Sequence, residues 1–181
     1  ADLAGPLSQP ARGGAIYILG IVDEYSRWLW IFPLKTKAEA VTKMDEFLTR
    51  HRDVKHLIRV VSTDQGGEFQ SSFDNMLGRH EIDHWQTAAE CPATRGAIER
   101  VWGTVMPMMA CNLRYAGLRE QNLDLWWYAL SYAVWCYNRV THANDTVTPF
   151  EHRFQEEPDL KHAKVWGCPC FVRIPIDKQL K

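Results

Sequence analysis

The feature that most constrains the fold is a short apolar run that ends in an aspartate and two glycines. Residues 58–61 are rich in β-branched side chains, and Asp64 then precedes Gly66 and Gly67. Such a run, bounded by glycines, predicts a buried strand and then a tight turn. The Asp64 carboxylate would stand at the strand's C-terminal tip, where the glycines leave room. The alternative is an ordinary turn aspartate, because aspartate is common before glycine in turns.

Two further carboxylates stand beside turn signals. Asp2 precedes Gly5-Pro6, and Glu99 falls in the first turns of a predicted helix that follows a proline–glycine loop. Hard carboxylate oxygens suit Mg²⁺ or Mn²⁺, and three of them suit a two-metal site for phosphoryl transfer. Without metal, each pair at ~4 Å would repel by roughly 4 kcal/mol at an effective dielectric of ~20. We therefore expect a metal-free site to be loose or partly protonated.

Each of these assignments has an alternative. Glu99 could instead pair on the surface with Arg95 or Arg100, an interaction of under ~1 kcal/mol. Asp23 also ends a predicted strand and is a weaker candidate for the first carboxylate; we interpret it as a hairpin-turn residue.

Hydrophobic periodicity predicts a mixed α/β order of elements. We expect a hairpin over 15–34 ending at Pro33, a helix over 37–51, a strand over 58–63, a short helix to 79, a strand over 82–85, an irregular loop over 86–95, helices over 93–116 and 123–140, and a final strand over 165–174. Pro107 should kink the third helix or end its regular part. This order indicates an α/β or α+β fold with a mixed sheet.

Composition narrows the class of protein. The 181 residues, 46% hydrophobic with eight Trp, fit one ordered domain. No apolar run reaches the roughly 18 residues of a membrane span, and the chain does not open as a signal peptide does. Five cysteines without a C-x-x-C pair suggest reduced thiols in an intracellular protein. The net charge of −1 is unusual for a nucleic-acid binder, which is commonly basic.

Several short motifs occur together along the whole chain. They lie at residues 2–6, 22–27, 33–37, 62–69, 96–100, 138–139, 148–151, 158–160 and 165–168. In this order they resemble the catalytic core of retrotransposon integrases of the copia type. These enzymes belong to the DDE polynucleotidyl transferases, which have an RNase H-like fold.

The resemblance implies an architecture. It predicts an α/β, RNase H-like fold with a mixed central sheet of about five strands flanked by helices. Residues 1–181 would form a single integrase catalytic core domain, with about 30 C-terminal residues packed on it as an extension. The family's zinc-binding N-terminal segment and long C-terminal tail are not found in the sequence.

The resemblance also implies a site and a reaction. Asp2, Asp64 and Glu99 would be the catalytic, metal-binding triad and would hold two Mg²⁺ (or Mn²⁺) ions. The family's enzymes trim the 3′ ends of the element's DNA, a nuclease step, and then transfer the new 3′ ends into target DNA. Candidate contacts to DNA phosphates are Lys35, Lys37, Arg95 and Arg100, whose alternative is a solvated charge. His84 and Trp85 are expected to be structural.

The implied partners are retroelement DNA ends, target DNA and further copies of the chain, in a homodimer or higher oligomer without a membrane. The implied location is the retroelement particle and the nucleus.

The helix after Glu99 departs from the family pattern. That helix normally opens with basic and amide residues, whereas Arg100 is followed here by Val101-Trp102-Gly103. This departure keeps a second hypothesis open, a domesticated integrase fold that acts as a protein-interaction scaffold with little or no catalysis. A third hypothesis is a plain metal-dependent nuclease of the RNase H-like class.

Overall fold

The computed structural model of the protein describes residues 1–51, 58–64, 66, 69, 71–86, 92–118, 120–143 and 145–171, with the side chains of 92–95, 120 and 121 outside the description. The strands are β1 (Asp2–Ala4), β2 (Tyr17–Val22), β3 (Leu29–Leu34), β4 (Val60–Thr63) and β5 (Asp83–Gln86). The helices are α1 (Glu39–Arg50), α2 (Ser71–Arg79), α3 (Pro92–Tyr115), the 3₁₀-helix η3 (Glu120–Leu125), α4 (Trp126–Tyr137) and α5 (Pro149–Phe154).

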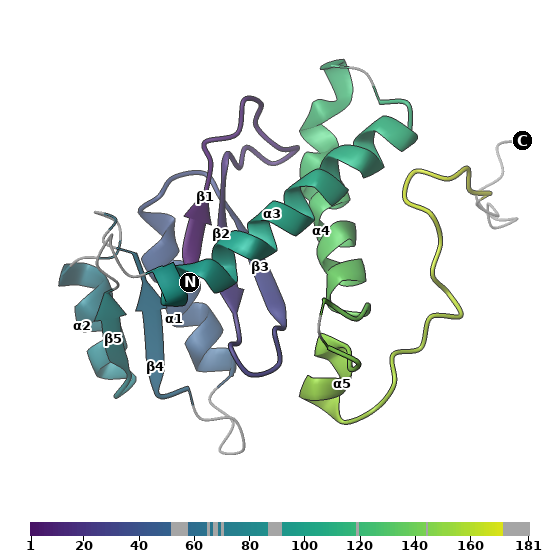
Figure 1. Ribbon diagram of the computed structural model, residues 1–181. Coiled ribbons are helices and arrows are strands. Elements are labelled where there is room, and N and C mark those ends of the chain that lie inside the picture. Colours follow the sequence, from purple (N-terminus) through teal and green to yellow (C-terminus); the bar gives the residue numbers. More distant parts are fainter. Residues whose placement is uncertain are drawn as a thin grey trace, which may run out of the picture.

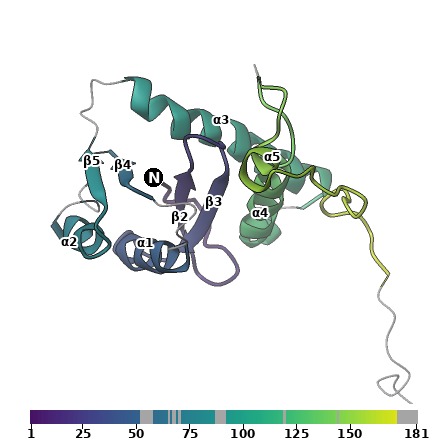
Figure 2. The same cartoon turned by 90° about the horizontal axis from the view of Figure 1, so that it is seen from below.

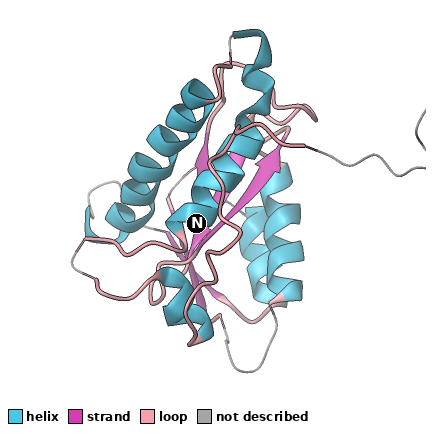
Figure 3. Ribbon diagram, turned by 90° about the vertical axis from the view of Figure 1, so that its right-hand side faces the viewer, coloured by secondary structure: helices cyan, strands magenta, loops and turns pink. Residues whose placement is uncertain are grey.

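The strands form a central layer between helices. Figure 1 shows α3 crossing in front of the strands and α1 behind them, with α4 beyond β3 and α2 beside β5. Seen from below, α1 and α2 lie on one side of the strands and α3 on the other (Figure 2). Figure 3 shows the same helix–strand–helix layering from the side. The arrangement is an α/β fold with helices on both faces of the strands.

The five described strands pair in two ladders. β1, β2 and β3 form an antiparallel sheet, and β4 pairs with β5 in parallel. The start of β1 lies beside β4, because the Ala1 α-amino group donates to Ser62 O at 2.5 Å. The hairpin predicted over 15–34 is therefore confirmed, and the strands are mixed in direction. The expected five-stranded sheet is met only in part, as sheets of three and two strands.

The core lies in two clusters, one on each face of β2. Ile18 packs with Leu29, Val105 and Leu130 on the side of α3 and α4, whereas Leu19 faces the residues of α1 and α2. This separation follows from the two-residue period of a strand, which sends neighbouring side chains to opposite faces. Because both faces are covered, β2 is an almost uninterrupted apolar run, as buried strands usually are.

The last helices are attached to β3 by one buried amide. Asn138 is 3% exposed, and its side chain accepts from Leu29 N and donates to Leu29 O, each at 2.9 Å. The backbone carbonyl oxygen of Asn138 also accepts from Phe150 N at 2.9 Å. Asn138 thus links α4, β3 and α5, which explains the structural role of the motif at 138–139.

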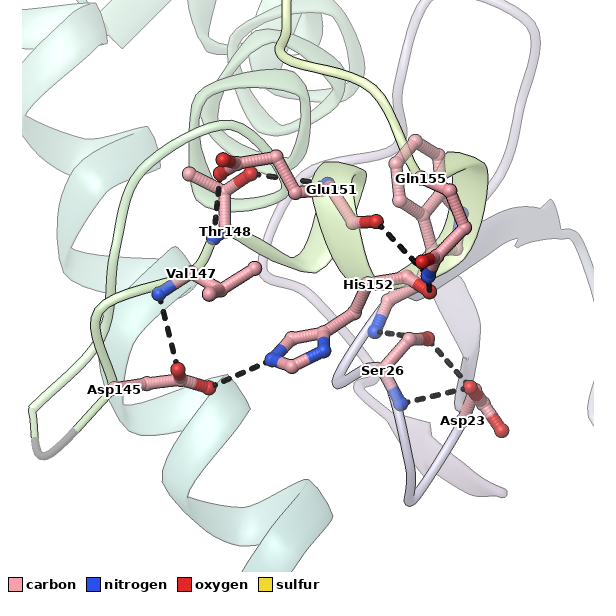
Figure 4. Close-up of polar contacts among 9 residues, drawn as sticks. Asp23, Ser26, Asp145, Val147, Thr148, Glu151, His152 and Gln155 are labelled. Carbon is pink, nitrogen blue, oxygen red and sulfur yellow. Dashed lines mark hydrogen bonds and ion pairs between the residues drawn. The ribbon is translucent and has the colours of Figure 1, made fainter.

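The motif at 148–151 caps α5. Thr148 Oγ1 accepts from Glu151 N at 3.1 Å, and the Glu151 carboxylate accepts from Thr148 N at 2.8 Å (Figure 4). This reciprocal pair is a capping box with proline at the first helical position. Figure 4 also shows His152 of α5 beside Asp145, and Asp23 and Ser26 in the nearby β2–β3 turn.

Three sequence-based expectations need correction. Pro107 was expected to kink α3 or end its regular part; α3 continues as one helix to Tyr115, so the second outcome does not occur. Helix α3 also begins at Pro92, so residues 92–95 are helical rather than part of an irregular loop, while 87–91 lie outside the described residues. The strand expected at 165–174 is absent from 165–171, and 172–174 lie outside the description.

The terminal segment still contacts the body. Trp166 packs against the cluster beneath α3 and α4, and the Tyr132 hydroxyl donates to Lys164 O. Side-chain packing and one side-chain hydrogen bond, rather than strand pairing, make these contacts. Among the described cysteines, Cys111, Cys136, Cys168 and Cys170 are free. In the part of the chain that the structure covers, no helix has the length and apolarity to cross a membrane.

Candidate active site

A cavity of about 800 Å³ opens between β2, β4 and the first turns of α3. Asp2 of β1, Asp64 after β4 and Glu99 of α3 all line it. These are the three carboxylates predicted from the sequence, and they come from three separate elements. The fold therefore brings all three to one cavity, although they are far apart along the chain.

Asp2 is the most constrained of the three. Its Oδ1 accepts from Leu3 N at 2.8 Å, and its Oδ2 accepts from the Trp102 indole N–H at 3.0 Å. Burial raises the pKa of Asp2 above its usual 3.8, and the charge of Asp64 adds to the rise. The two donated hydrogen bonds oppose it, because they favour the ionised form.

Asp64 stands at the tip of β4, as its position before the glycines predicts. Gly66 N donates to Asp64 Oδ1 at 3.2 Å, which bends the chain just after the strand. Behind it, Thr63 Oγ1 donates to Asp64 O at 2.9 Å and lies 2.8 Å from His84 Nε2. His84 Nδ1 in turn contacts the Asp74 carboxylate. This chain of contacts, which starts at the half-exposed Asp74 and passes through the buried His84 side chain, supports the backbone beneath Asp64. The expectation that His84 is structural agrees with its contacts.

Glu99 is exposed on α3 and faces the same cavity. The donor set of Asp2, Asp64 and Glu99 fits a hard divalent cation, because it offers carboxylate oxygens alone. Within the described residues, however, no three His, Cys, Asp or Glu side chains are gathered closely enough to hold a metal ion.

Positive charge and aromatic rings also line the cavity, and the sequence did not reveal them. The cations are Arg50, Arg59 and Arg153. The Arg153 guanidinium lies 4.5 Å from the centre of the Trp30 ring, and burial lowers its pKa. Arg50 is one of several charged residues of α1, a pattern typical of a solvated helix face. Arg59 directly precedes β4, which is the one local signal that could have identified it.

Trp85 corrects an expectation. It was expected to be structural, but it is 61% exposed and lines the cavity. Asp23 behaves as predicted for a turn residue, because its Oδ2 accepts from Ser26 N at 2.9 Å and from Ser26 Oγ.

The predicted DNA contacts divide. Lys35 and Lys37 are exposed just beyond β3, outside the residues that line the cavity. Arg100 is exposed on α3 next to Glu99, and its guanidinium lies over Gly96 of the preceding turn. The side chain of Arg95 lies outside the described residues. Arg100 follows Glu99 in sequence but, like Lys35 and Lys37, is not among the residues that line the cavity.

The sequence of this chain matches one protein family model and several known proteins. The family model described as "Integrase core domain" matches residues 1–91. The Pol polyprotein of transposon TNT 1-94 of Nicotiana tabacum is 28% identical over 189 residues, which cover 100% of this chain and 14% of that protein. The Pol polyprotein of transposon RE2 of Arabidopsis thaliana is 30% identical over 160 residues, covering 86% of this chain and 10% of that protein. The chain thus spans only a small share of these relatives.

Two solved structures share the fold. The simian T-cell lymphotropic virus intasome, in complex with PP2A regulatory subunit B56 gamma, matches with a TM-score of 0.61 and 18% identity, over 93% of this chain and 64% of that chain. The HTLV-2 integrase catalytic core domain in complex with magnesium matches with a TM-score of 0.54 and 18% identity, over 72% of this chain and 79% of that chain. The similarity confirms the predicted RNase H-like α/β class.

Proposed function

Because the chain belongs to the integrase core domain family, we propose that it is the catalytic core of a divalent-metal-dependent polynucleotidyl transferase. Its reaction would be 3′-end processing of retroelement DNA and transfer of the processed ends into target DNA. The observation that supports this best is that Asp2, Asp64 and Glu99, from β1, β4 and α3, line one cavity.

The site residues divide into two groups by charge. Asp2, Asp64 and Glu99 would hold two Mg²⁺ or Mn²⁺ ions, which supply nucleophile activation and leaving-group stabilisation when bound. Arg59 and Arg153, on the same cavity, would contact DNA phosphates. The arginines would attract the DNA phosphates, which the carboxylates alone would repel.

The related structures support the partners of this proposal. The HTLV-2 core was solved in complex with magnesium and in a trimeric form, and the simian virus protein was solved as an intasome. For this chain we accordingly propose Mg²⁺ as the cofactor, DNA ends and target DNA as substrates, and self-association. The proposed location is the retroelement particle and the nucleus. Sedimentation that shows a monomer at high concentration would contradict the self-association.

The test is calorimetric titration of Mn²⁺ and Mg²⁺ into the wild-type chain, Asp64→Asn and Asp159→Asn. Asp159 is exposed and lies away from the cavity, so Asp159→Asn is the matched control for loss of one carboxylate. We expect Asp64→Asn to abolish measurable binding and Asp159→Asn to bind as the wild type does. Nicking of labelled duplex DNA, dependent on metal and on Asp64, would then establish the phosphoryl-transfer chemistry.

A second function is favoured by one specific observation. Val101-Trp102-Gly103 replace the polar residues that usually follow the family's glutamate, and the chain carries a net charge of −1. A protein-interaction scaffold would keep the fold without binding metal. Equal and negligible binding of Mn²⁺ by the wild type and Asp64→Asn would favour the scaffold. Nicking without strand transfer would favour a plain nuclease.

A further inference from the structure

Trp102 of α3 touches the candidate site in a way that the proposed function does not use. Its indole N–H donates to Asp2 Oδ2 at 3.0 Å, across 100 positions of the chain. The rest of the ring is partly buried and packs against the cluster formed with Val101 and Val105. One end of this side chain therefore belongs to the core, and its N–H reaches the cavity carboxylate.

The contact depends on a missing side chain. Gly20 of β2 stands opposite Asp2 in the ladder, on the same face of the strand as Ile18. A Cβ added at Gly20 would lie 2.4 Å from Trp102 Cζ2 and 2.8 Å from Cη2. Real Cβ atoms do not approach so closely, so only glycine at this position lets the indole pass over the strand to Asp2. Gly20, Trp102 and Asp2 thus form one geometric unit.

Resting on the proposed function, we propose that Trp102 is a positioning residue for the Asp2 carboxylate, and that Gly20 provides the space it needs. With Leu3 N on Oδ1 and Trp102 on Oδ2, one donor engages each oxygen and fixes the rotation of the carboxylate plane. A carboxylate oxygen has about two lone-pair directions, so each oxygen keeps one for a cation. Groups that orient a metal ligand in this way typically change metal affinity by 10- to 100-fold.

The first test reads the contact without metal. The indole N–H resonance of Trp102 is assigned by NMR as the signal that is missing from the spectrum of Trp102→Phe. We expect Asp2→Asn to shift this signal and increase its solvent exchange, and to leave the Trp126 signal unchanged. Trp126 is a suitable internal reference because its N–H donates elsewhere, to Gln9 O at 3.0 Å. An unchanged Trp102 signal would show that the contact does not exist and would overturn the proposal.

The second test reads the positioning role. Mn²⁺ affinity is measured by calorimetry for the wild type, Trp102→Phe, Trp102→Gln, Gly20→Ala and the control Trp126→Phe, with thermal unfolding recorded for each. We expect about 10-fold weaker binding for Trp102→Phe and Gly20→Ala. Trp102→Gln keeps an N–H donor and should recover part of the affinity, while Trp126→Phe should alter stability alone.

The outcomes separate this proposal from the proposed function. Wild-type affinity in Trp102→Phe, where Asp64→Asn has lost binding, would overturn the positioning role and leave the metal site intact. Tighter binding in Trp102→Phe would also overturn it, because the indole would then be competing with the cation for Oδ2. A wild-type chain that binds no Mn²⁺ would overturn the proposed function and this role together, even where the NMR contact is present.

Discussion

Single side chains connect parts of this fold that lie far apart in the sequence. Asn138 pairs with both backbone groups of Leu29, and Trp102 reaches Asp2. Neither role can be inferred from sequence, because each depends on a partner about a hundred positions away. A tryptophan on an apolar helix is interpreted as a core residue, and only the folded structure shows where its N–H points. Asp64 was recognisable because its signal, a strand followed by glycines, is local.

Asn138 offers a direct test of such a contact. Replacing it with alanine would leave Leu29 N and Leu29 O buried without their partners. Each unsatisfied group costs about 1–3 kcal/mol, so we expect Asn138→Ala to lower the free energy of unfolding by about 2–4 kcal/mol. Denaturant unfolding measures this. Asn112→Ala, which loses one bond to Ala129 O at 3.1 Å, should cost less; equal losses would contradict the role given to Asn138.

His142 predicts a pH dependence. Burial lowers the pKa of His142 below its usual 6.5, and its Nε2 is buried without a hydrogen-bond partner among the described residues. Its ring stacks on Tyr137 with centroids 4.1 Å apart. The unfolded chain therefore takes up this proton at a higher pH than the folded one. The stability that the folded protein gains by keeping His142 neutral is fully present above pH ~6.5. It is lost as the pH falls from there toward the lowered pKa.

The measurement is urea unfolding of the wild type and His142→Phe between pH 7.5 and 5. We expect the wild type to lose more stability than the variant across this range, because the variant has no such proton to bind. Parallel pH profiles would show that His142 does not contribute.

At the scale of elements, periodicity predicted what repeats locally and missed what packing decides. The hairpin over 15–34, helix α1 and the long helices lie where their apolar spacing placed them. Pro107 was expected to kink α3 or end its regular part, and α3 does not end there. Pro107 lies exposed on the solvent face, four residues after the exposed Gly103. Pro107 has no N–H to donate to Gly103 O, and at this exposed position water can take the place of that donor, so the helix continues. The final strand failed because apolar residues such as Trp166 pack singly against the body.

Pro107→Ala tests this reading of α3. Proline inside a helix is about 3 kcal/mol less favourable than alanine, and part of that is offset because proline also restricts the unfolded chain. We expect a net gain of about 1–2 kcal/mol, seen as a higher midpoint of thermal unfolding. Pro149→Ala is the matched control, since proline at the first position of α5 is favourable and its loss should not stabilise. A lower midpoint for Pro107→Ala would mean that α3 needs the proline.

At the scale of the whole molecule, charge sets the conditions for binding DNA. The chain carries a net charge of −1, and its cavity holds Asp2, Asp64 and Glu99 together with Asp23 and Glu24. A phosphate backbone approaching these acids is repelled, and three arginines on the same cavity do not outnumber them. The near-neutral charge of the sequence predicted weak attraction for DNA. The cavity arginines could not be predicted, because they come together only when α1, β4 and α5 pack in the fold.

Removal of metal should therefore weaken DNA binding as well as chemistry. We expect the affinity for a short duplex, followed by fluorescence anisotropy at fixed ionic strength, to fall at least tenfold on changing from Mn²⁺ to EDTA. Divalent cations bound to the carboxylates would remove this repulsion. Without metal, the protein's own cations make few phosphate contacts, so the affinity for DNA should depend only weakly on salt concentration. Asp64→Asn has one negative charge fewer and a damaged cation site, so its affinity for the duplex should differ little between Mn²⁺ and EDTA. If the wild type binds the duplex equally well in EDTA, the attraction arises from a basic surface outside the cavity, and the exposed Lys35 and Lys37 become the first residues to replace.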